Sequence, residues 1–240
     1  MRKLTVIFAA IMLFSQALDA QVKEKFKTYD IIPKGEKLAG LQFAYLNMNS
    51  ENSEYLLLAN GLDAKASFSS LAPTMAYAVS TNRVIGARVA FNSASGYLDD
   101  TTLSLLNDGL EFDLHNVSAS LKQRSAEAFY RRYLGLEEKG RLGLFYECAL
   151  SYSYSKTAFS LNDKSDDWSG SARAKFSFSP GIVFFPSSNI STQVCVSLAD
   201  VTWGHTTYMS DGEAKGSMTR FRSQIGLDLL GISFGLIIHI

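Results

Sequence analysis

The chain of 240 residues is poor in the residues on which many enzyme and metal sites depend. Its two cysteines and three histidines are widely separated and show none of the short spacings typical of zinc ligands. It has no glycine-rich phosphate-binding loop, and its acidic stretch at 162–167 lacks the glycine and glutamate of a dedicated calcium loop. We therefore expect no metal and no cofactor, and no motif indicates an enzyme.

Long hydrophobic runs are also missing. Arg2 and Lys3 precede an apolar stretch of 11 residues, Leu4–Phe14, which is too short to span a bilayer as a helix. Residues 1–20 are predicted to be a cleaved export signal that ends at Ala20, and the alternative is that they remain as an anchor. After residue 20 no stretch of 18 apolar residues remains, so no helical span is predicted.

No excess of either charge is present. Lysine plus arginine and aspartate plus glutamate both number 23, and loss of residues 1–20 leaves a net charge of −1. This balance gives no reason to expect a nucleic-acid partner. Residues 21–37 are charged and aperiodic, and we interpret them as a periplasmic lead segment. Residues 38–240 have the length of a single domain.

What the sequence does contain is alternation of apolar and polar residues. Over the 14 residues Leu142–Ser155, even positions are apolar or aromatic, and odd positions are mostly small or polar. Successive side chains of a strand point to opposite faces, so one face of this segment is apolar. A strand this long, apolar on one face and with tyrosines near its end, is typical of a transmembrane β-barrel.

Seven other segments are predicted to be strands of the same barrel. The full set is Leu38–Met48, Ala66–Val79, Val84–Asn92, Val117–Leu134, Leu142–Ser155, Ser171–Phe185, Ile190–Trp203 and Thr219–Ile240. The last changes its apolar face once, after Leu229. A bulge near Gly231 explains this change better than a turn between two short strands, because such barrels have even strand numbers. Four longer connections are predicted to be loops: Asn49–Lys65, Ser93–Asn116, Thr157–Gly170 and Gly204–Met218.

An internal repeat supports this organisation. Residues Pro73–Asn82 align with Pro180–Asn189 at an offset of 107 residues, and both follow the pattern Pro-x-x-x-aromatic-x-x-Ser-x-Asn. The alignment places Tyr77 and Phe184 at one height, as a lower aromatic girdle requires. The opposite strand ends carry a second set of aromatic residues: Tyr45, Phe91, Tyr152, Tyr154 and Trp203.

With these two turns, the signal segment before Gln21 and the ending Leu230–Leu236, the chain resembles the small outer-membrane β-barrel proteins of Bacteroidetes type, often called porin-family proteins. The resemblance implies an eight-stranded antiparallel up-and-down transmembrane β-barrel in the cell outer membrane, with both ends in the periplasm. It also implies a monomer whose partners are outer-membrane lipid and the barrel-assembly machinery. Such chains commonly end in an aromatic residue, whereas this one ends in Ile240.

The alternation also predicts which charged side chains face the lumen. These are Arg88, Arg131, Glu147, Arg173, Lys175, Arg220, Arg222 and Asp228. The interior of an eight-stranded barrel is just wide enough for side chains to fill, so charges there must pair or be hydrated. One interpretation is a plug of internal ion pairs in a structural, surface-interaction or ligand-binding protein. The alternative is a cationic passage, as in a narrow anion-preferring porin.

The remaining candidates for chemistry are isolated. Cys148 lies on the apolar face of its strand and Cys195 on the polar face of another, so we predict two free thiols. His205 near the outer rim, followed by Thr206 and Thr207, could act as a base in a lipid-modifying enzyme, but the spacing is not diagnostic. His239 is predicted to be an inward-facing, hydrogen-bonded filler.

Overall fold

The computed structural model describes residues 29–53, 62–99, 101–104, 111–114, 117–161, 164–210 and 213–240. The predicted export signal at 1–20 and the third histidine of the chain, His115, lie outside the described residues. Of the lead segment predicted at 21–37, the described part begins at Tyr29. Within the described strands, the side chains of 227–231, which include Asp228, are also outside the description.

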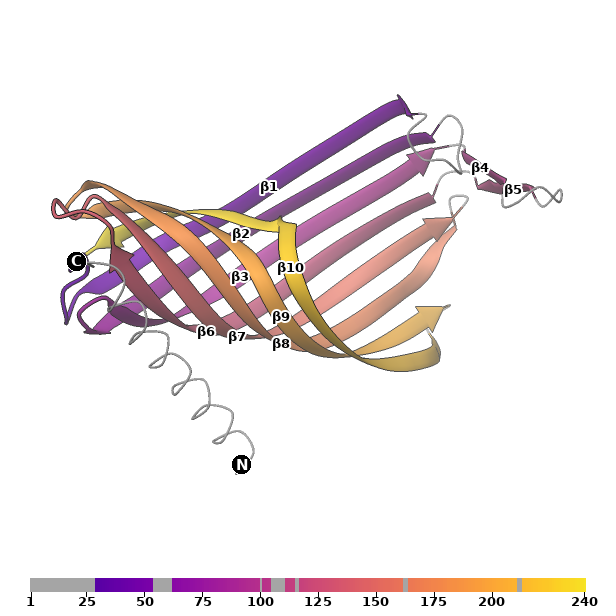
Figure 1. Ribbon diagram of the computed structural model, residues 1–240. Helices are drawn as coiled ribbons and strands as arrows, with labels where there is room; N and C mark the ends of the chain where they lie inside the picture. The colour runs from indigo at the N-terminus through magenta and orange to yellow at the C-terminus, as the bar shows by residue number, and fades with distance from the viewer. Residues whose placement is uncertain are drawn as a thin grey trace.

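Eight long strands form a barrel, and two short strands form a separate hairpin (Figure 1). The elements are β1 Lys37–Ser53, β2 Leu62–Ser80, β3 Arg83–Asp99, β4 Thr101–Ser104, β5 Glu111–Leu114, β6 Val117–Gly135, β7 Leu142–Leu161, β8 Lys164–Ser187, β9 Ile190–Ser210 and β10 Glu213–His239. Each barrel strand pairs antiparallel with its neighbours in the order β1-β2-β3-β6-β7-β8-β9-β10, and β10 returns to β1. The predicted eight-stranded antiparallel up-and-down barrel is confirmed.

The barrel has an apolar outside and a polar inside. Along β7, Leu150, Tyr152 and Tyr154 are exposed on the outer wall, whereas Ser151 and Ser153 line the interior. The aromatic residues predicted for two girdles are all exposed: Tyr45, Tyr77, Phe91, Tyr152, Tyr154, Phe184 and Trp203. A surface of this kind is stable in a lipid bilayer and costly in water, so the outer wall is that of a membrane-spanning barrel.

The two ends of the barrel differ. The turns at Thr81–Asn82, 136–141 and 188–189 lie at one end with the C-terminus, which we call the turn end; the opposite end is the loop end (Figure 1). Two predicted loops are wrong over most of their length, because β7 continues to Leu161 and β8 begins at Lys164, and β9 and β10 likewise approach within two residues of each other. These stretches are rich in small and hydroxyl side chains, which pair through the backbone without an apolar face to mark them.

The last strand is continuous, as the bulge interpretation predicts. β10 shows register shifts against β9 between Ile225 and Asp228 and between Asp228 and Ser233. Its outward residues change from the odd position Ile225 to the even position Phe234 across this irregularity. A further shift, which the alternation does not reveal, separates Cys195 from Ala199 on β9 where it pairs with β8.

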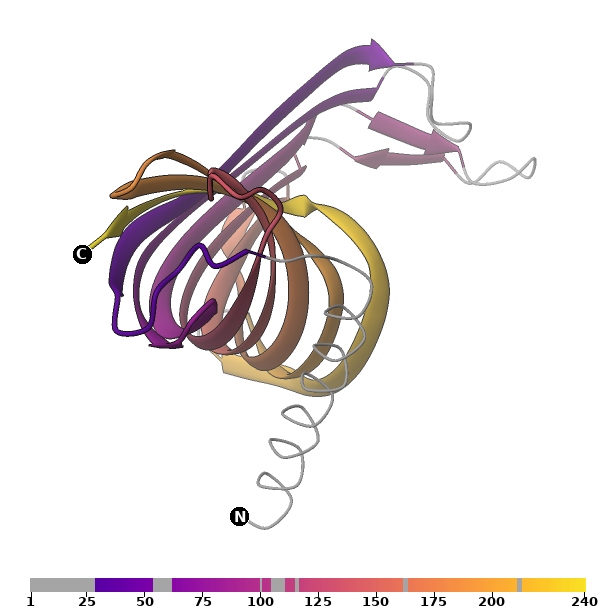
Figure 2. The ribbon, with the colours of Figure 1, turned by 60° about the vertical axis from the view of Figure 1, so that its left-hand side comes forward.

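The barrel wall is not closed along its whole height. β1 and β10 pair over six positions at the turn end, from Leu38 opposite His239 to Phe43 opposite Phe234. Beyond Phe43 toward the loop end, β1 pairs only with β2 within the described residues. Beyond Phe234 toward the loop end, β10 likewise pairs only with β9. Figures 1 and 2 show the two strands diverging toward the loop end. The structure therefore has a seam in its wall beside the upper lumen.

Candidate functional site

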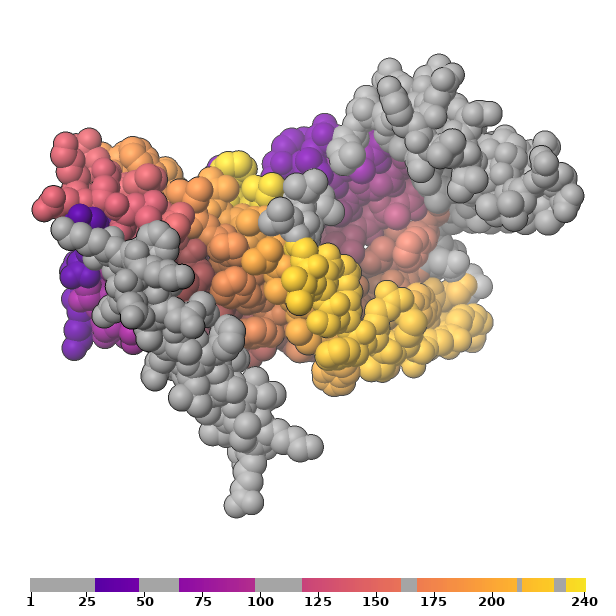
Figure 3. Space-filling view, in the orientation of Figure 1, coloured from indigo at the N-terminus to yellow at the C-terminus, as the bar shows by residue number. Residues whose placement is uncertain are grey.

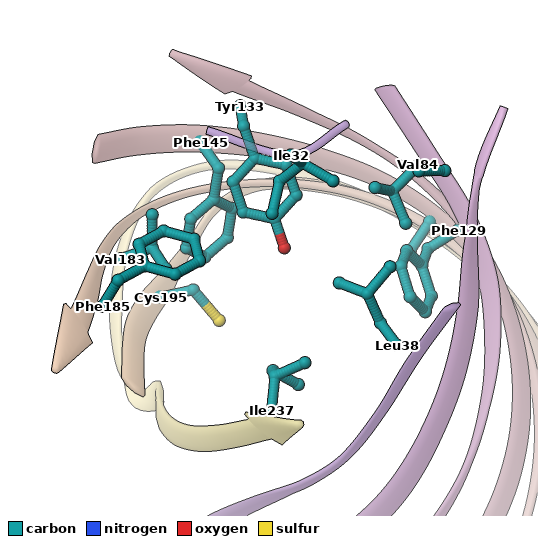
Figure 4. Close-up of a cluster of buried hydrophobic side chains, with 12 residues drawn as sticks. Ile32, Leu38, Val84, Phe129, Tyr133, Phe145, Val183, Phe185, Cys195 and Ile237 are labelled. Carbon is teal, nitrogen blue, oxygen red and sulfur yellow. The ribbon is translucent and has the colours of Figure 1, made fainter. Parts of the chain in front are cut away.

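The turn end of the lumen is filled by an apolar layer. Its buried side chains, from all eight barrel strands and the segment before β1, point toward one another across the lumen (Figure 4). They are Ile32, Leu38, Ala78, Val84, Phe129, Tyr133, Phe145, Ala149, Val183, Phe185, Cys195 and Ile237. Gly86 and Gly181 make room for the rings of Phe129 and Phe145, because a Cβ atom at either glycine would collide with the ring beside it.

The segment before β1 closes this end, which the sequence does not reveal. Ile32 is fully buried in the apolar layer. Asn82, in the left-handed conformation at φ 59°, holds the segment: its Oδ1 accepts hydrogen bonds from the backbone N–H of Ile31 and of Ile32, both 2.9 Å, and its Nδ2 donates to the Tyr29 carbonyl at 3.0 Å. Because asparagine tolerates this conformation better than most residues, one side chain makes both the turn and the clamp.

A second contact ties the end of the segment to the last strand. His239 Nδ1 lies 2.7 Å from Glu36 Oε1, and His239 Nε2 lies 2.7 Å from Ser191 Oγ. Both His239 and Ser191 are buried. His239 is thus an inward-facing hydrogen-bonded residue, as its phase predicts.

Above the apolar layer lies a cluster of two arginines and two glutamates, which we call the plug: Arg88, Glu127, Arg131 and Glu147. Glu147 is 4% exposed and accepts hydrogen bonds from both arginines. Arg131 Nε and Nη2 lie 2.9 and 2.6 Å from Glu147 Oε2, and Arg88 Nε lies 2.8 Å from Glu127 Oε1. The four formal charges cancel, so the plug is neutral as a whole and its charges are paired across three strands.

Neutral side chains complete the plug. Gln42 accepts a hydrogen bond from Arg88, while Gln193 and the Tyr133 hydroxyl accept from Arg131. The guanidinium carbon of Arg88 lies 4.5 Å from the Phe129 ring centroid, and that of Arg131 lies 4.3 Å from the Phe145 centroid. Stacking on the apolar layer offsets part of the cost of burying these cations. Together the two layers fill the lower lumen.

Above the plug the lumen is open and basic, and we call this part the cup. Arg173 and Lys175 on β8 and Arg220 and Arg222 on β10 line it. In the strand register, Arg173 and Arg220 flank Gly204 of β9, and Lys175 and Arg222 flank Thr202. The four cations therefore form two rows with small residues between them.

Few acidic groups offset these charges. Asp200 lies on β9 two residues from Thr202, on the side of the plug, and accepts a hydrogen bond from the Thr202 hydroxyl at 3.2 Å. In the described part of the chain, none of the four cations forms an ion pair with a carboxylate. Arg173 instead donates to the Ser171 hydroxyl, Arg220 to the Met218 sulfur and Arg222 to the Gln224 side chain. The cup thus offers several cationic groups to a ligand.

The cup is large enough for a small molecule. It belongs to a cavity of about 670 Å³, whose floor includes Arg88 and Glu147 of the plug and whose wall is rich in serine. Figure 3 shows the hollow between the purple N-terminal strands of the barrel, β1 and β2, and the yellow strand β10. Because the seam between β1 and β10 borders it, the cup opens both toward the loop end and sideways.

Most residues predicted to face the lumen lie in these two sites. Arg88, Arg131 and Glu147 are in the plug, and Arg173, Lys175, Arg220 and Arg222 are in the cup. Asp228 pairs with Ser197 in the register, and its side chain is outside the described residues. Sequence reasoning missed Glu127, Gln42 and Gln193. All three lie in step with predicted inward positions, so the strand phase alone could have found them.

The other isolated candidates are not brought together. Cys148 and Cys195 are free thiols on opposite faces of the wall, as their phases predict, and Cys195 Sγ lies 3.0 Å from Ser233 Oγ inside. His205 lies in β9 rather than in a loop, and its Nδ1 lies 3.0 Å from Thr219 Oγ1. Thr219, and not Thr206 or Thr207, is therefore its hydroxyl neighbour, and no carboxylate of the described residues hydrogen-bonds to this imidazole.

Two further observations apply to the described ranges only. No group of three or more His, Cys, Asp or Glu side chains there is arranged to hold a metal ion. No helix there is long and apolar enough to cross a membrane.

The chain was compared with known families, curated proteins and solved structures. No protein-family model matches the chain, and no curated protein matches it. Among solved structures it is similar to the outer membrane protein OprG from Pseudomonas aeruginosa, with 13% identity, 87% of this chain and 97% of that chain covered, and a TM-score of 0.46. Neisserial surface protein A (NspA) gives 12% identity, 85% and 97% coverage and a TM-score of 0.37. Ail of Yersinia pestis gives 12% identity, 86% and 95% coverage and a TM-score of 0.32. The fold is established by the strand pairing of the chain itself.

Proposed function

We propose that this protein is a non-enzymatic outer-membrane β-barrel whose lower lumen is plugged and whose basic cup binds a small anionic ligand from outside. The observation that carries the proposal is the division of the lumen at Glu147. Below it, paired charges and apolar side chains fill the barrel; above it, four cations line an open cavity. The apolar outer wall and the short turns at one end support an outer-membrane location with the turn end in the periplasm.

The ligand is a compact anion with two or more negative charges. In each row one cation stands on β8 and the other on β10, with β9 between them. The backbones of the two cations are therefore about 10 Å apart, which is two strand spacings. Their long side chains can converge over Gly204 and Thr202. Phosphate or carboxylate groups suit guanidinium and ammonium donors.

A narrow anion-preferring porin is the second candidate, because the same four cations would attract anions into a channel. It requires a continuous water path through the plug. The plug residues and the apolar layer beneath them fill that path, so the binding cup is the function that the geometry supports better.

Binding of pyrophosphate and citrate to the refolded chain in detergent micelles tests the cup. We expect Arg173→Gln/Arg220→Gln to weaken binding by about 100-fold, because each of the two lost charge-assisted hydrogen bonds is worth roughly 1.5 kcal/mol. Isothermal titration calorimetry at low salt measures the affinity. A matched control, Lys139→Gln/Arg141→Gln, removes two exposed cations near the turn end. Equal weakening in the control, or no binding by the unmodified chain, would contradict the cup.

A further inference from the structure

Three cations gather on the outer wall, away from the lumen. Gln123 and Ser125 of β6 line the cavity, so the alternate residues Lys122 and Arg124 face outward, and both are exposed. On β7, Ser153 and Thr157 line the cavity, so exposed Lys156 faces outward as well. We call Lys122, Arg124 and Lys156 the outer-wall patch.

The strand register places these cations side by side. Lys122 lies directly opposite Lys156, and Arg124 lies directly opposite Tyr154. Like charges directly opposite in a sheet are destabilising. The residues that flank them on the next strands are Ser93 and Phe91 on one side and Gly170 and Ala172 on the other. No described carboxylate forms an ion pair with any of the three, so their repulsion is left for an external anion to relieve.

Aromatic residues set the height of the patch. Arg124 lies between Phe91 and Tyr154 in the register, and Lys156 Nζ lies 4.3 Å from the Trp168 ring centroid. Aromatic side chains of membrane proteins concentrate at the level of the lipid headgroups. Below the patch the outer wall of β7 is apolar, with Tyr152 and Leu150 exposed. The three cations therefore stand at the loop-end boundary of the membrane.

Gly170 lets two aromatic side chains lie close to the wall beside them. A Cβ atom at Gly170 would lie 3.1 Å from the Tyr154 hydroxyl and 3.4 Å from Trp168 Cζ3. The absence of a side chain at Gly170 therefore lets the rings of Tyr154 and Trp168 pack closely over the strand. The Tyr154 hydroxyl can donate a hydrogen bond to an anion.

We propose that the outer-wall patch is a binding site for a headgroup phosphate of an outer-leaflet glycolipid. Three cations match a phosphate monoester, which carries up to about two negative charges near neutral pH, better than a singly charged phosphodiester. The acyl chains of such a lipid would lie against the apolar wall of β6 and β7. The inference takes only the membrane orientation from the proposed function and is independent of ligand binding in the cup.

The test follows the fluorescence of Trp168 as lipid A bearing two phosphates is titrated into phosphatidylcholine vesicles that contain the full-length chain. A Trp203→Phe background leaves Trp168 as the single tryptophan. We expect the triple variant Lys122→Gln/Arg124→Gln/Lys156→Gln to shift the midpoint to about 100-fold higher lipid A, at about 5-fold per lost cation. Removal of the phosphates from lipid A should abolish the change.

The control separates a site from bulk charge. Lys34→Gln/Lys139→Gln/Arg141→Gln removes three exposed cations near the turn end and should leave the midpoint unchanged. An equal shift in this control, an unchanged midpoint in the patch variant, or an equal response to phosphatidylglycerol would overturn the proposal. Heat-shifted gel mobility verifies that each variant is folded, and Arg124→Gln alone, with an expected shift of about 5-fold, replaces the triple variant if that variant does not fold.

Discussion

Glu147→Gln is expected to lower the free energy of unfolding by about 3–5 kcal/mol, the cost of leaving a buried charge without its partner. Glu147 is 4% exposed and is the carboxylate shared by Arg88 and Arg131. Glutamine preserves the volume but not the charge, so Arg131 keeps only neutral partners while Arg88 retains Glu127. Urea-induced unfolding in lipid vesicles, followed by circular dichroism, measures the loss.

Glu127→Gln is the matched control for that experiment. Glu127 is 20% exposed at its side chain and, among the described residues, forms an ion pair with Arg88 alone. Its loss should therefore cost about 1 kcal/mol, nearer to the value of a partly exposed ion pair. If the Glu127 variant is destabilised as much as the Glu147 variant, Glu147 is not the centre of the plug.

Asn82→Ala is expected to release the segment before β1 and to lower the free energy of unfolding by about 2–4 kcal/mol. The substitution removes the acceptor for the N–H groups of Ile31 and Ile32. Only the Ile32 bond is fully buried, and one unsatisfied buried donor costs about 1–3 kcal/mol. It also places alanine at φ 59°, which adds about 1 kcal/mol of strain. Limited proteolysis should then cut the chain before Lys37 faster, and urea unfolding gives the stability change.

Two variants isolate the cause of that effect. Asn189→Ala changes the equivalent residue of the internal repeat, which is exposed and accepts a side-chain hydrogen bond only from Ser188, so it should alter stability by less than about 0.5 kcal/mol. Asn82→Gly keeps the backbone freedom but loses the clamp, so it should fall between Asn82→Ala and the unmodified chain. Equal behaviour of the Asn82 and Asn189 variants would contradict the clamp.

The two copies of the repeat show where sequence reasoning ends. Both copies make a turn, and Tyr77 and Phe184 are both on the outer wall. Of the two asparagines, only Asn82 has a positive φ. Only its turn lies against the segment before β1, to which the Asn82 side chain is hydrogen-bonded. The pattern of ten residues describes a turn but carries no information on what packs against it.

The lumen was predictable in part for a related reason. Alternation with a period of two sets the face of each side chain, so Arg88, Arg131 and Glu147 could be placed inside without a structure. Alternation does not predict which of these side chains contact each other, because Arg88 on β3 and Glu147 on β7 belong to strands that are separated by β6. The apolar layer was missed since Val183, Phe185 and Ile237 occur in stretches where both faces are apolar. The seam was missed because the pairing of the first and last strands leaves no local signal.

Single-channel recording of the refolded chain in planar bilayers tests the plugged lumen most directly. The recordings use protein shown by heat-shifted gel mobility to be folded, with Arg173→Ala/Arg222→Ala alongside. The paired charges of the plug and the apolar layer beneath it predict a silent bilayer for both proteins. Steady anion-selective openings that weaken in the variant would contradict the plug and identify the basic cup as the mouth of a pore.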